Sequence, residues 1–416
     1  MKQTAFSQFA VDNASILYLS LIRKDHTNSY RFSMTLTEEV CPDILQTAVD
    51  RVYRRFPSVI AGFYPGFFHY LQVPAKTPPQ VQPDPGMLIT MSRDEIQNCA
   101  FRVYHRDNTI AIEAFHALTD GYGAIACFTT LVSEYLRLKY GVHIPVEKTL
   151  IDVHENPNLQ EVTDSYLTYE TGKPLHLPSR YAYQLPGGAD GRSCVMTSTM
   201  TVEIQELLDA SHQYGVSITA LLSSVMAQSV MEIQQMHSSG GPLRPVRIMV
   251  PVDLRRLFPS RTLRNFILYA LPTMEPHDCD KPISDLLRSF GRQLKEQMEQ
   301  KRLASIMAYN VRTQRSWFFR RIPLVLKCAA MRLAYRYFGE SNSSVTVTNL
   351  GNVSLPEEMQ SYVENIQVFL TPRANSPYNC SVISYDGQLS IHISRFCKQP
   401  ELEDVFFRNL QSVLHA

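Results

Sequence analysis

The sequence predicts a mixed α/β fold made of two similar halves, and three observations support this prediction. Segments with strand-like alternation and segments with helical spacing follow one another along the whole chain. Hairpin signals recur among them, so the sheets are expected to be mixed rather than wholly parallel. A stretch rich in loop residues separates the two series of elements. With 416 residues, 44% hydrophobic and 19% charged, the chain can bury two large cores.

Residues 1–160 are expected to form an N-terminal domain. Its first helix is indicated by Leu45, Val49 and Val52, which recur at helical spacing. A second long helix is indicated by an apolar stripe that ends before Gly141, a residue type common after helix C-termini. The expected elements are strands at 16–19, 30–36, 59–64 and 68–73, helices at 42–56 and 121–140, and a hairpin at 100–114.

Residues 161–190 are expected to be a linker, because Gly and Pro cluster there. Residues 191–416 restart the alternation as a C-terminal domain, although no residue-level repeat is visible. Its last hairpin is indicated by the turn Asp386-Gly387. The expected elements are strands at 195–202, 246–252, 265–271, 344–348 and 366–370, helices at 203–214, 217–236, 282–302 and 402–414, and a hairpin at 380–391.

Composition argues against several function classes. The formal net charge is +1, so nothing in the charge favours nucleic acid as a partner. The eight cysteines and twelve histidines are dispersed, with no Cys-x-x-Cys pair and no histidines four residues apart; no metal site is expected. The N-terminal sequence lacks the apolar region of a signal peptide, and no apolar run reaches the roughly 20 residues that span a bilayer. We expect a cytoplasmic monomer.

The segment with the most chemical content is Phe-His-Ala-Leu-Thr-Asp-Gly at residues 115–121, between a predicted strand and a predicted helix. A histidine at a strand end can act as a general base near neutral pH. Asp120 could brace the loop that carries His116, and Gly121 would permit close backbone approach. A short pattern like this also fits a buried core histidine followed by an aspartate that only caps the helix.

This segment resembles the His-His-x-x-x-Asp-Gly signature of CoA-dependent acyltransferases. That superfamily includes chloramphenicol acetyltransferase, plant BAHD acyltransferases, alcohol acetyltransferases and nonribosomal-peptide condensation domains. Further segments resemble the family's segments in family order, and the bacterial alcohol-acetyltransferase-like branch is the most similar. These segments are 45–58 with Arg55-Phe56-Pro57, 250–255 followed by Asn265-Phe266, 348–351, and 385–389.

The resemblance implies two chloramphenicol-acetyltransferase-like domains with an active-site tunnel at their interface. It implies that His116 is the general base and that Asp120 has a structural role, paired with Arg255 or, alternatively, Arg55. It implies no tightly bound cofactor; acyl-CoA, in the first instance acetyl-CoA, would be the co-substrate. The acceptor would be a small alcohol or a lipid-like molecule.

The remaining candidates and departures leave alternatives open. Asn265, Thr348 and Asn349 lie at expected strand ends and could contact substrate or the oxyanion, or could be structural. Phe115 replaces the first histidine of the signature, which weakens the resemblance to condensation domains. The leading interpretation is an O-acyltransferase that transfers directly, since no nucleophile motif is present. Amide formation with a carrier-bound acyl donor and a non-catalytic scaffold of the same fold are the alternatives.

Residues 310–338 carry many arginines interleaved with aromatic and aliphatic side chains. Such a basic amphipathic helix either packs one face on the second half of the protein, or lies on a membrane surface or receives a lipid-like acceptor.

Overall fold

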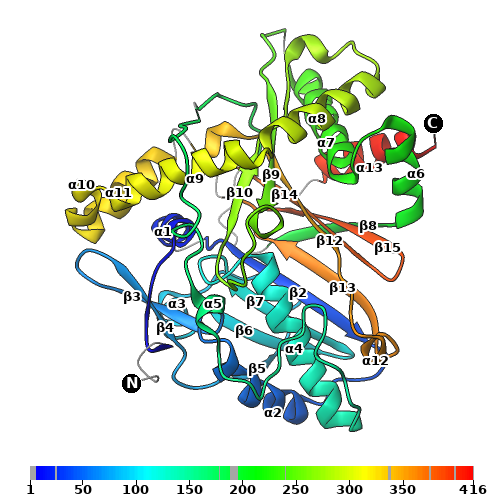
Figure 1. Cartoon of the computed structure of the whole chain (residues 1–416). Helices are drawn as coiled ribbons and strands as arrows, with labels where there is room; N and C mark the ends of the chain where they lie inside the picture. Colours follow the sequence, from blue (N-terminus) through cyan, green and yellow to red (C-terminus); the bar gives the residue numbers. More distant parts are fainter. Residues whose placement is uncertain are drawn as a thin grey trace.

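The computed structural model describes residues 6–23, 26–177, 179–187, 195–238, 240–335, 339–373, 376–397 and 400–415. Two large mixed sheets, each covered by helices, make up its two halves (Figure 1). The mixed α/β fold predicted from the sequence is confirmed.

The first sheet has five strands in the order β13-β2-β7-β6-β5. Helices α2 and α4 pack together beside it, and a small sheet, β1-β4-β3, lies next to them. The bounds are β1 Phe9–Ala10, β2 Ser29–Leu36, α2 Pro42–Val52, β3 Ala61–Pro65, β4 Tyr70–Pro74, β5 Val81–Pro83, α3 Arg93–Asn98, β6 Phe101–Arg106, β7 Thr109–Phe115, α4 Gly121–Tyr140, α5 Leu159–Val162 and β13 Val363–Leu370.

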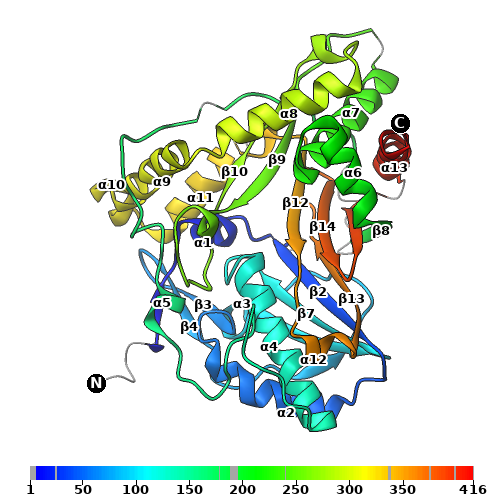
Figure 2. The same cartoon turned by 45° about the vertical axis from the view of Figure 1, so that its right-hand side comes forward.

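The second sheet runs β10-β9-β12-β14-β15-β8, with β11 also paired to β9. Helix α7 packs on β9 and β12, and α6, α8 and α13 pack against α7 (Figure 2). The bounds are β8 Met196–Glu203, α6 Ile204–Tyr214, α7 Ile218–His237, β9 Val246–Asp253, β10 Ile267–Ala270, β11 Thr273–Met274, α8 Ile283–Gln297, α9 Gln300–Arg315, α10 Trp317–Arg321, α11 Leu324–Ala334, β12 Val345–Asn352, α12 Glu357–Gln360, β14 Tyr378–Tyr385, β15 Gln388–Arg395 and α13 Glu401–Leu414.

The strand predicted at 16–19 is wrong, because these residues belong to helix α1, Asn13–Ser20. Four consecutive apolar residues fit either periodicity, and the residues before them decide the outcome. The Asp12 carboxylate accepts a hydrogen bond from the Ser15 amide at 2.8 Å and so caps the helix.

The single helix predicted over 282–302 and the basic helix predicted over 310–338 are also wrong in their bounds. The chain breaks after α8 and continues into α9. It breaks again at Ser316, which caps α10, and at Pro323, which precedes α11. Residues 336–338 of the basic segment lie outside the described residues.

Strand β13 crosses between the halves. It comes from residue 363 onward, yet it pairs antiparallel with β2 in the first sheet, with Leu370 opposite Tyr30 and Val363 opposite Leu36. Its side chains Ile366 and Val368 are buried in the first half's core. The division into 1–160, 161–190 and 191–416 stays a prediction, and this strand does not follow it.

Among the described helices, none is by itself both long and apolar enough to span a bilayer; α6 and α7 meet that test only as a pair bent by 84°.

Candidate active site

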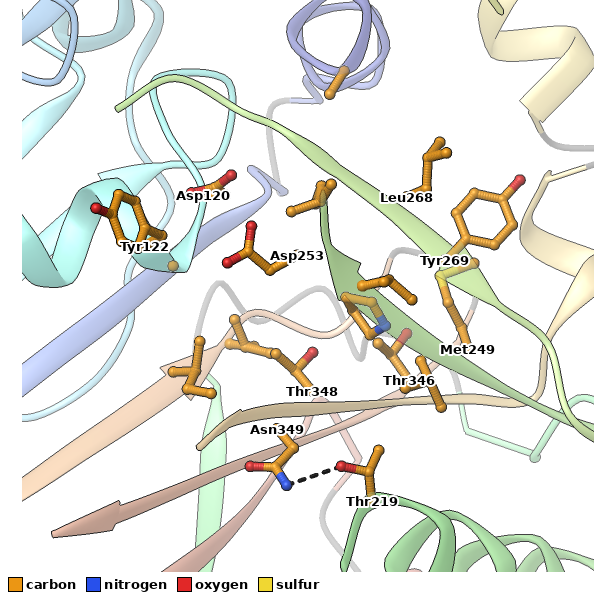
Figure 3. Close-up of a pocket in the computed structure, with 18 of the residues that line it drawn as sticks. Asp120, Tyr122, Thr219, Met249, Asp253, Leu268, Tyr269, Thr346, Thr348 and Asn349 are labelled. Carbon is orange, nitrogen blue, oxygen red and sulfur yellow. Dashed lines mark hydrogen bonds between the residues drawn. The ribbon is translucent and has the colours of Figure 1, made fainter. Parts of the chain in front are cut away.

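A large cavity of about 1880 Å³ lies between the two halves. The first half contributes α1 and the turn after β7, and the second contributes β9, β10 and β12 (Figure 3). On two sides it is bordered by α8 and by the helices α9 to α11. The cavity lies where the family resemblance implies an active-site tunnel.

His116 borders this cavity directly after the end of β7. Its ring stacks on Tyr18 of α1, with centroids 4.5 Å apart, and Tyr30 meets it edge-on at 5.0 Å. Its backbone is held on both sides: the amide donates to the Asn28 carbonyl at 2.8 Å, and Asn265 donates to its carbonyl at 3.1 Å. The imidazole is thus fixed in orientation by two aromatic rings.

The two ring nitrogens of His116 differ in access. Nδ1 is buried, whereas His116 as a whole borders the cavity, and we infer that Nε2 is the nitrogen that faces it. Burial lowers the pKa of His116 below its ordinary value, and its own backbone, the Asp120 charge and Asn265 oppose this effect only in part. The histidine is therefore neutral at pH 7, the form that accepts a proton.

Asp120 does not point its carboxylate at the imidazole. Oδ2 accepts a hydrogen bond from the Phe266 amide at 2.8 Å and lies 2.8 Å from Arg255 Nη1. Oδ1 accepts from the Gly123 amide at 3.3 Å and so caps α4. Asp120 thus joins the first half to the second, with both oxygens occupied.

Arg255 is the partner of Asp120, as the resemblance implied. Its guanidinium also donates to the Thr262 carbonyl at 3.0 Å and the Arg264 carbonyl at 2.6 Å. Burial acts to lower the pKa of Arg255, but the Asp120 and Asp253 carboxylates outweigh it and raise the pKa overall. The alternative, Arg55, is engaged elsewhere, since it pairs with Glu161 at 2.6 Å.

The glycines after Asp120 allow the halves to approach closely. A Cβ on Gly121 would lie 2.5 Å from Leu350 Cδ2 of β12, and a Cβ on Gly123 would lie 2.2 Å from the Leu263 carbonyl oxygen. Thr119 Oγ1 donates to that same carbonyl. Space, rather than an unusual backbone conformation, is what requires glycine here.

The three candidates for substrate contact have different positions. Asn265 is fully buried and does not border the cavity, because its amide donates to the carbonyls of His116 and Ala117. Thr348 and Asn349 both border the cavity, and Asn349 donates to Thr219 of α7 at 3.1 Å (Figure 3). The position of Asn265 fits support of the His116 backbone, and Thr348 and Asn349 are the candidates that border the cavity.

Sequence reasoning missed two features of the cavity. The sequence predicts a strand for the segment of Tyr18, and a strand would not place this ring on His116. A cationic cluster was overlooked although its spacing is visible in the sequence, at intervals of four and three residues on α8. The cluster borders the cavity and consists of Arg288, Arg292 and Lys295 of α8, with Arg256 and His212 nearby on the lining.

Within the described part of the chain, no group of three or more His, Cys, Asp or Glu side chains is arranged to hold a metal ion.

No family model and no curated protein matches the chain. Polyketide synthase associated protein 5 from Mycobacterium tuberculosis is similar over 98% of this chain and 98% of its own, with a TM-score of 0.64 and 15% identity. A variant of the starter condensation domain of rhizomide synthetase, in complex with C8-CoA and Leu-SNAC, is similar over 100% of this chain and 95% of its own. Its TM-score is 0.60 and its sequence identity is 15%. The TRI3 trichothecene 15-O-acetyltransferase from Fusarium sporotrichioides is similar over 98% of this chain and 95% of its own, with a TM-score of 0.59 and 12% identity. The chain therefore has the chloramphenicol-acetyltransferase-like fold that condensation domains and CoA-dependent acyltransferases share.

Proposed function

We propose that this protein transfers an acyl group from acyl-CoA to the hydroxyl of an alcohol, with His116 as general base. One observation carries the proposal: a neutral histidine, held between two aromatic rings, offers Nε2 to a large cavity lined by both halves. A cavity of this size accommodates two substrates at once, which direct transfer requires.

The step follows from this placement. The acceptor oxygen attacks the thioester carbonyl while its proton passes to Nε2 of His116. The tetrahedral intermediate collapses, the carbon–sulfur bond breaks, and the thiolate of CoA takes the proton from the imidazolium. Atoms and charges balance without a covalent acyl-enzyme.

The oxyanion of the intermediate needs a hydrogen-bond donor already in place. The Thr348 hydroxyl faces the cavity, and no hydrogen bond joins its side chain to another described residue. Thr348 is therefore the candidate donor, and Asp120 is assigned to architecture rather than proton transfer because both of its oxygens are occupied.

The two sides of the cavity differ in chemistry, and this difference supports a proposal for where each substrate binds. The cationic cluster on the α8 side suits the phosphates of CoA, since ammonium and guanidinium groups are the usual phosphate ligands. On the side of α1 and α11 the lining includes the apolar side chains Leu17, Leu21 and Met331, together with Asn13. An apolar alcohol or a lipid-like acceptor fits there, and an acetyl donor is the simplest acyl group to test.

The second candidate is amide formation from a carrier-bound acyl donor, because the same fold occurs in condensation domains. A phosphopantetheine arm brings one phosphate instead of the three of CoA. The cationic cluster has several positive side chains, which match the three phosphates of CoA better than the single phosphate of a carrier-bound arm. It therefore favours CoA as the acyl donor.

The experiment is thiol release from acetyl-CoA and longer acyl-CoA in the presence of aliphatic alcohols, followed by identification of the ester. We expect turnover by the wild type and a loss of about 10²- to 10⁴-fold in His116→Ala. His143→Ala is the matched control, since His143 is exposed and does not border the cavity. Wild-type turnover in His116→Ala would refute the proposed base. Amide formation when an amine and a carrier-bound acyl donor replace the alcohol and acyl-CoA, with no ester formed from alcohols, would favour the condensation reaction.

A further inference from the structure

Helices α10 and α11 and the tip of the β3–β4 hairpin expose an unusual number of large apolar side chains. Val325 is 80% exposed, Phe67 73% and Trp317 69%. We call this surface the apolar platform. Its exposed apolar members are Phe67, Phe68, Leu71, Trp317, Val325, Leu326 and Leu333.

The two segments of the platform form one continuous surface. The Leu324 amide donates to the Phe67 carbonyl at 2.8 Å, and Lys327 Nζ donates to the Phe68 carbonyl at 2.9 Å. Figures 1 and 2 show the hairpin and the two helices at the same edge of the molecule. One backbone hydrogen bond and one from the Lys327 side chain therefore hold the two segments together. An apolar area of this kind, rimmed by polar groups, marks an interaction surface.

The charge on the platform is of one sign. Neither residues 64–77 nor residues 316–335 contain an Asp or Glu. Arg320, Arg321 and Arg332 are exposed, and no carboxylate among the described residues pairs with them. The whole chain carries only +1, so this concentration of positive charge is local. Cationic side chains beside exposed aromatic and aliphatic ones are the composition of a surface that enters an anionic lipid interface.

The inner face of the same helices belongs to the candidate active site. Phe319 of α10 and Met331 of α11 border the cavity, on the side that we assigned to an apolar acceptor. One thin layer of helix thus separates the platform from the acceptor side of the cavity.

We propose that the apolar platform docks on an anionic lipid bilayer, with Trp317 and its apolar neighbours at the boundary between headgroups and acyl chains. The arginines contact the lipid phosphates. Docking brings the acceptor side of the cavity to the membrane, from which a lipid-like alcohol enters. This last point rests on the proposed function, whereas docking itself does not.

Trp317 is the only tryptophan of the chain, so its fluorescence reports on the platform alone. The full-length protein is mixed with vesicles of phosphatidylcholine, or of phosphatidylcholine with phosphatidylglycerol, at low and high salt. We expect flotation with the anionic vesicles, a blue shift of Trp317 emission, and weakening by salt. No flotation of the wild type with anionic vesicles at low salt would overturn docking.

Variants separate docking from nonspecific attraction and from catalysis. Val325→Glu/Leu326→Glu and Arg320→Glu/Arg321→Glu are each expected to lower the bound fraction about tenfold or more. The matched controls are Leu159→Glu, which is 58% exposed on α5, and Arg54→Glu/Arg261→Glu; these residues are exposed, lie off the platform and do not border the cavity. Equal loss of binding in the controls would overturn the platform's role.

Turnover of a short, soluble alcohol without vesicles distinguishes the two proposals. Val325→Glu/Leu326→Glu should keep this turnover, since its side chains point to solvent. Vesicle binding without any turnover in the wild type would defeat the proposed function and leave docking intact. If an acidic acyl carrier protein shifts Trp317 emission and anionic vesicles do not, the platform is a protein interface and lipid docking is refuted.

Discussion

Asp120 Oδ2 lies 2.8 Å from Arg255 Nη1, and this buried ion pair ties the turn that carries His116 to the second half of the molecule. Both side chains are nearly inaccessible to water, with 3% and 6% of their surfaces exposed. The position of the imidazole therefore depends on a contact between residues 135 positions apart.

Asp120→Asn tests how much this ion pair contributes to the stability of the fold. The substitution leaves Arg255 buried with less compensating charge, so we expect the free energy of unfolding to fall by about 3–5 kcal/mol. Urea unfolding measures the change. Arg255→Met should cost a similar amount, and the double variant should cost much less than the sum. Additive losses would show that the pair is not coupled. Arg315→Met, in the partly exposed pair with Glu170, is the control and should cost less than about 1 kcal/mol.

The pH dependence of activity tests the state of His116. Because burial lowers its pKa below the ordinary value of 6.5, the base is mainly neutral above pH 6.5 and is lost as the pH falls through the lowered pKa. We expect kcat/KM to be flat from pH 7 to 8 and to fall with a midpoint below 6.5. A midpoint of kcat/KM above pH 7 would contradict the lowered pKa of His116.

His392 predicts acid sensitivity of the fold. Burial lowers its pKa to about 4, so the unfolded chain binds a proton at a higher pH than the folded chain does. Stability contributed by the neutral form is complete above pH 6.5 and declines from there to about pH 4. Unfolding measured across this range should show the slope. His392→Gln should reduce it, and an unchanged slope would assign acid sensitivity to other groups.

Gly123→Ala tests the close approach between the halves. The added Cβ would lie 2.2 Å from a backbone oxygen, which cannot turn aside, so we expect a loss of about 1–3 kcal/mol. Gly241→Ala is the matched control, since nothing lies within 4 Å of its Cβ position. The midpoint of thermal unfolding is measured for both variants. Equal midpoints would show that the space around Gly123 does not require glycine.

Thr348→Val tests the proposed oxyanion donor. It preserves shape and removes the hydroxyl, so kcat should fall about 10²-fold with little change in KM. Thr346→Val, on the same strand and the same cavity wall, is the control and should keep kcat. An equal effect of both would indicate general disturbance of β12.

The cationic cluster predicts where the donor binds. Arg292→Glu/Lys295→Glu should raise KM for acetyl-CoA and leave KM unchanged for acetyl-pantetheine, which lacks the phosphates. Lys301→Glu, exposed and outside the cavity, is the control. A parallel rise for both donors would place the phosphates elsewhere.

Much of the fold could be predicted from sequence, because apolar periodicity records which side of an element is buried. Helix α4 begins and ends at the predicted residues, Gly121 and Tyr140. Periodicity fails where a run fits both patterns, and the mistaken strand at 16–19 concealed Tyr18, which fixes the His116 ring. Asn265 shows a second limit: the use of its amide depends on carbonyls almost 150 residues earlier, and no local pattern encodes that.

Strand β13 has a consequence for how the protein is made. On the ribosome, β2 and β7 emerge early, but the strand that completes their sheet follows only after some 250 further residues have been synthesised. Until then β2 has an open hydrogen-bonding edge, the kind of edge that recruits other chains. A chain that ends before residue 363 should thus aggregate more readily than one that includes β13, because its first sheet keeps an unpaired edge.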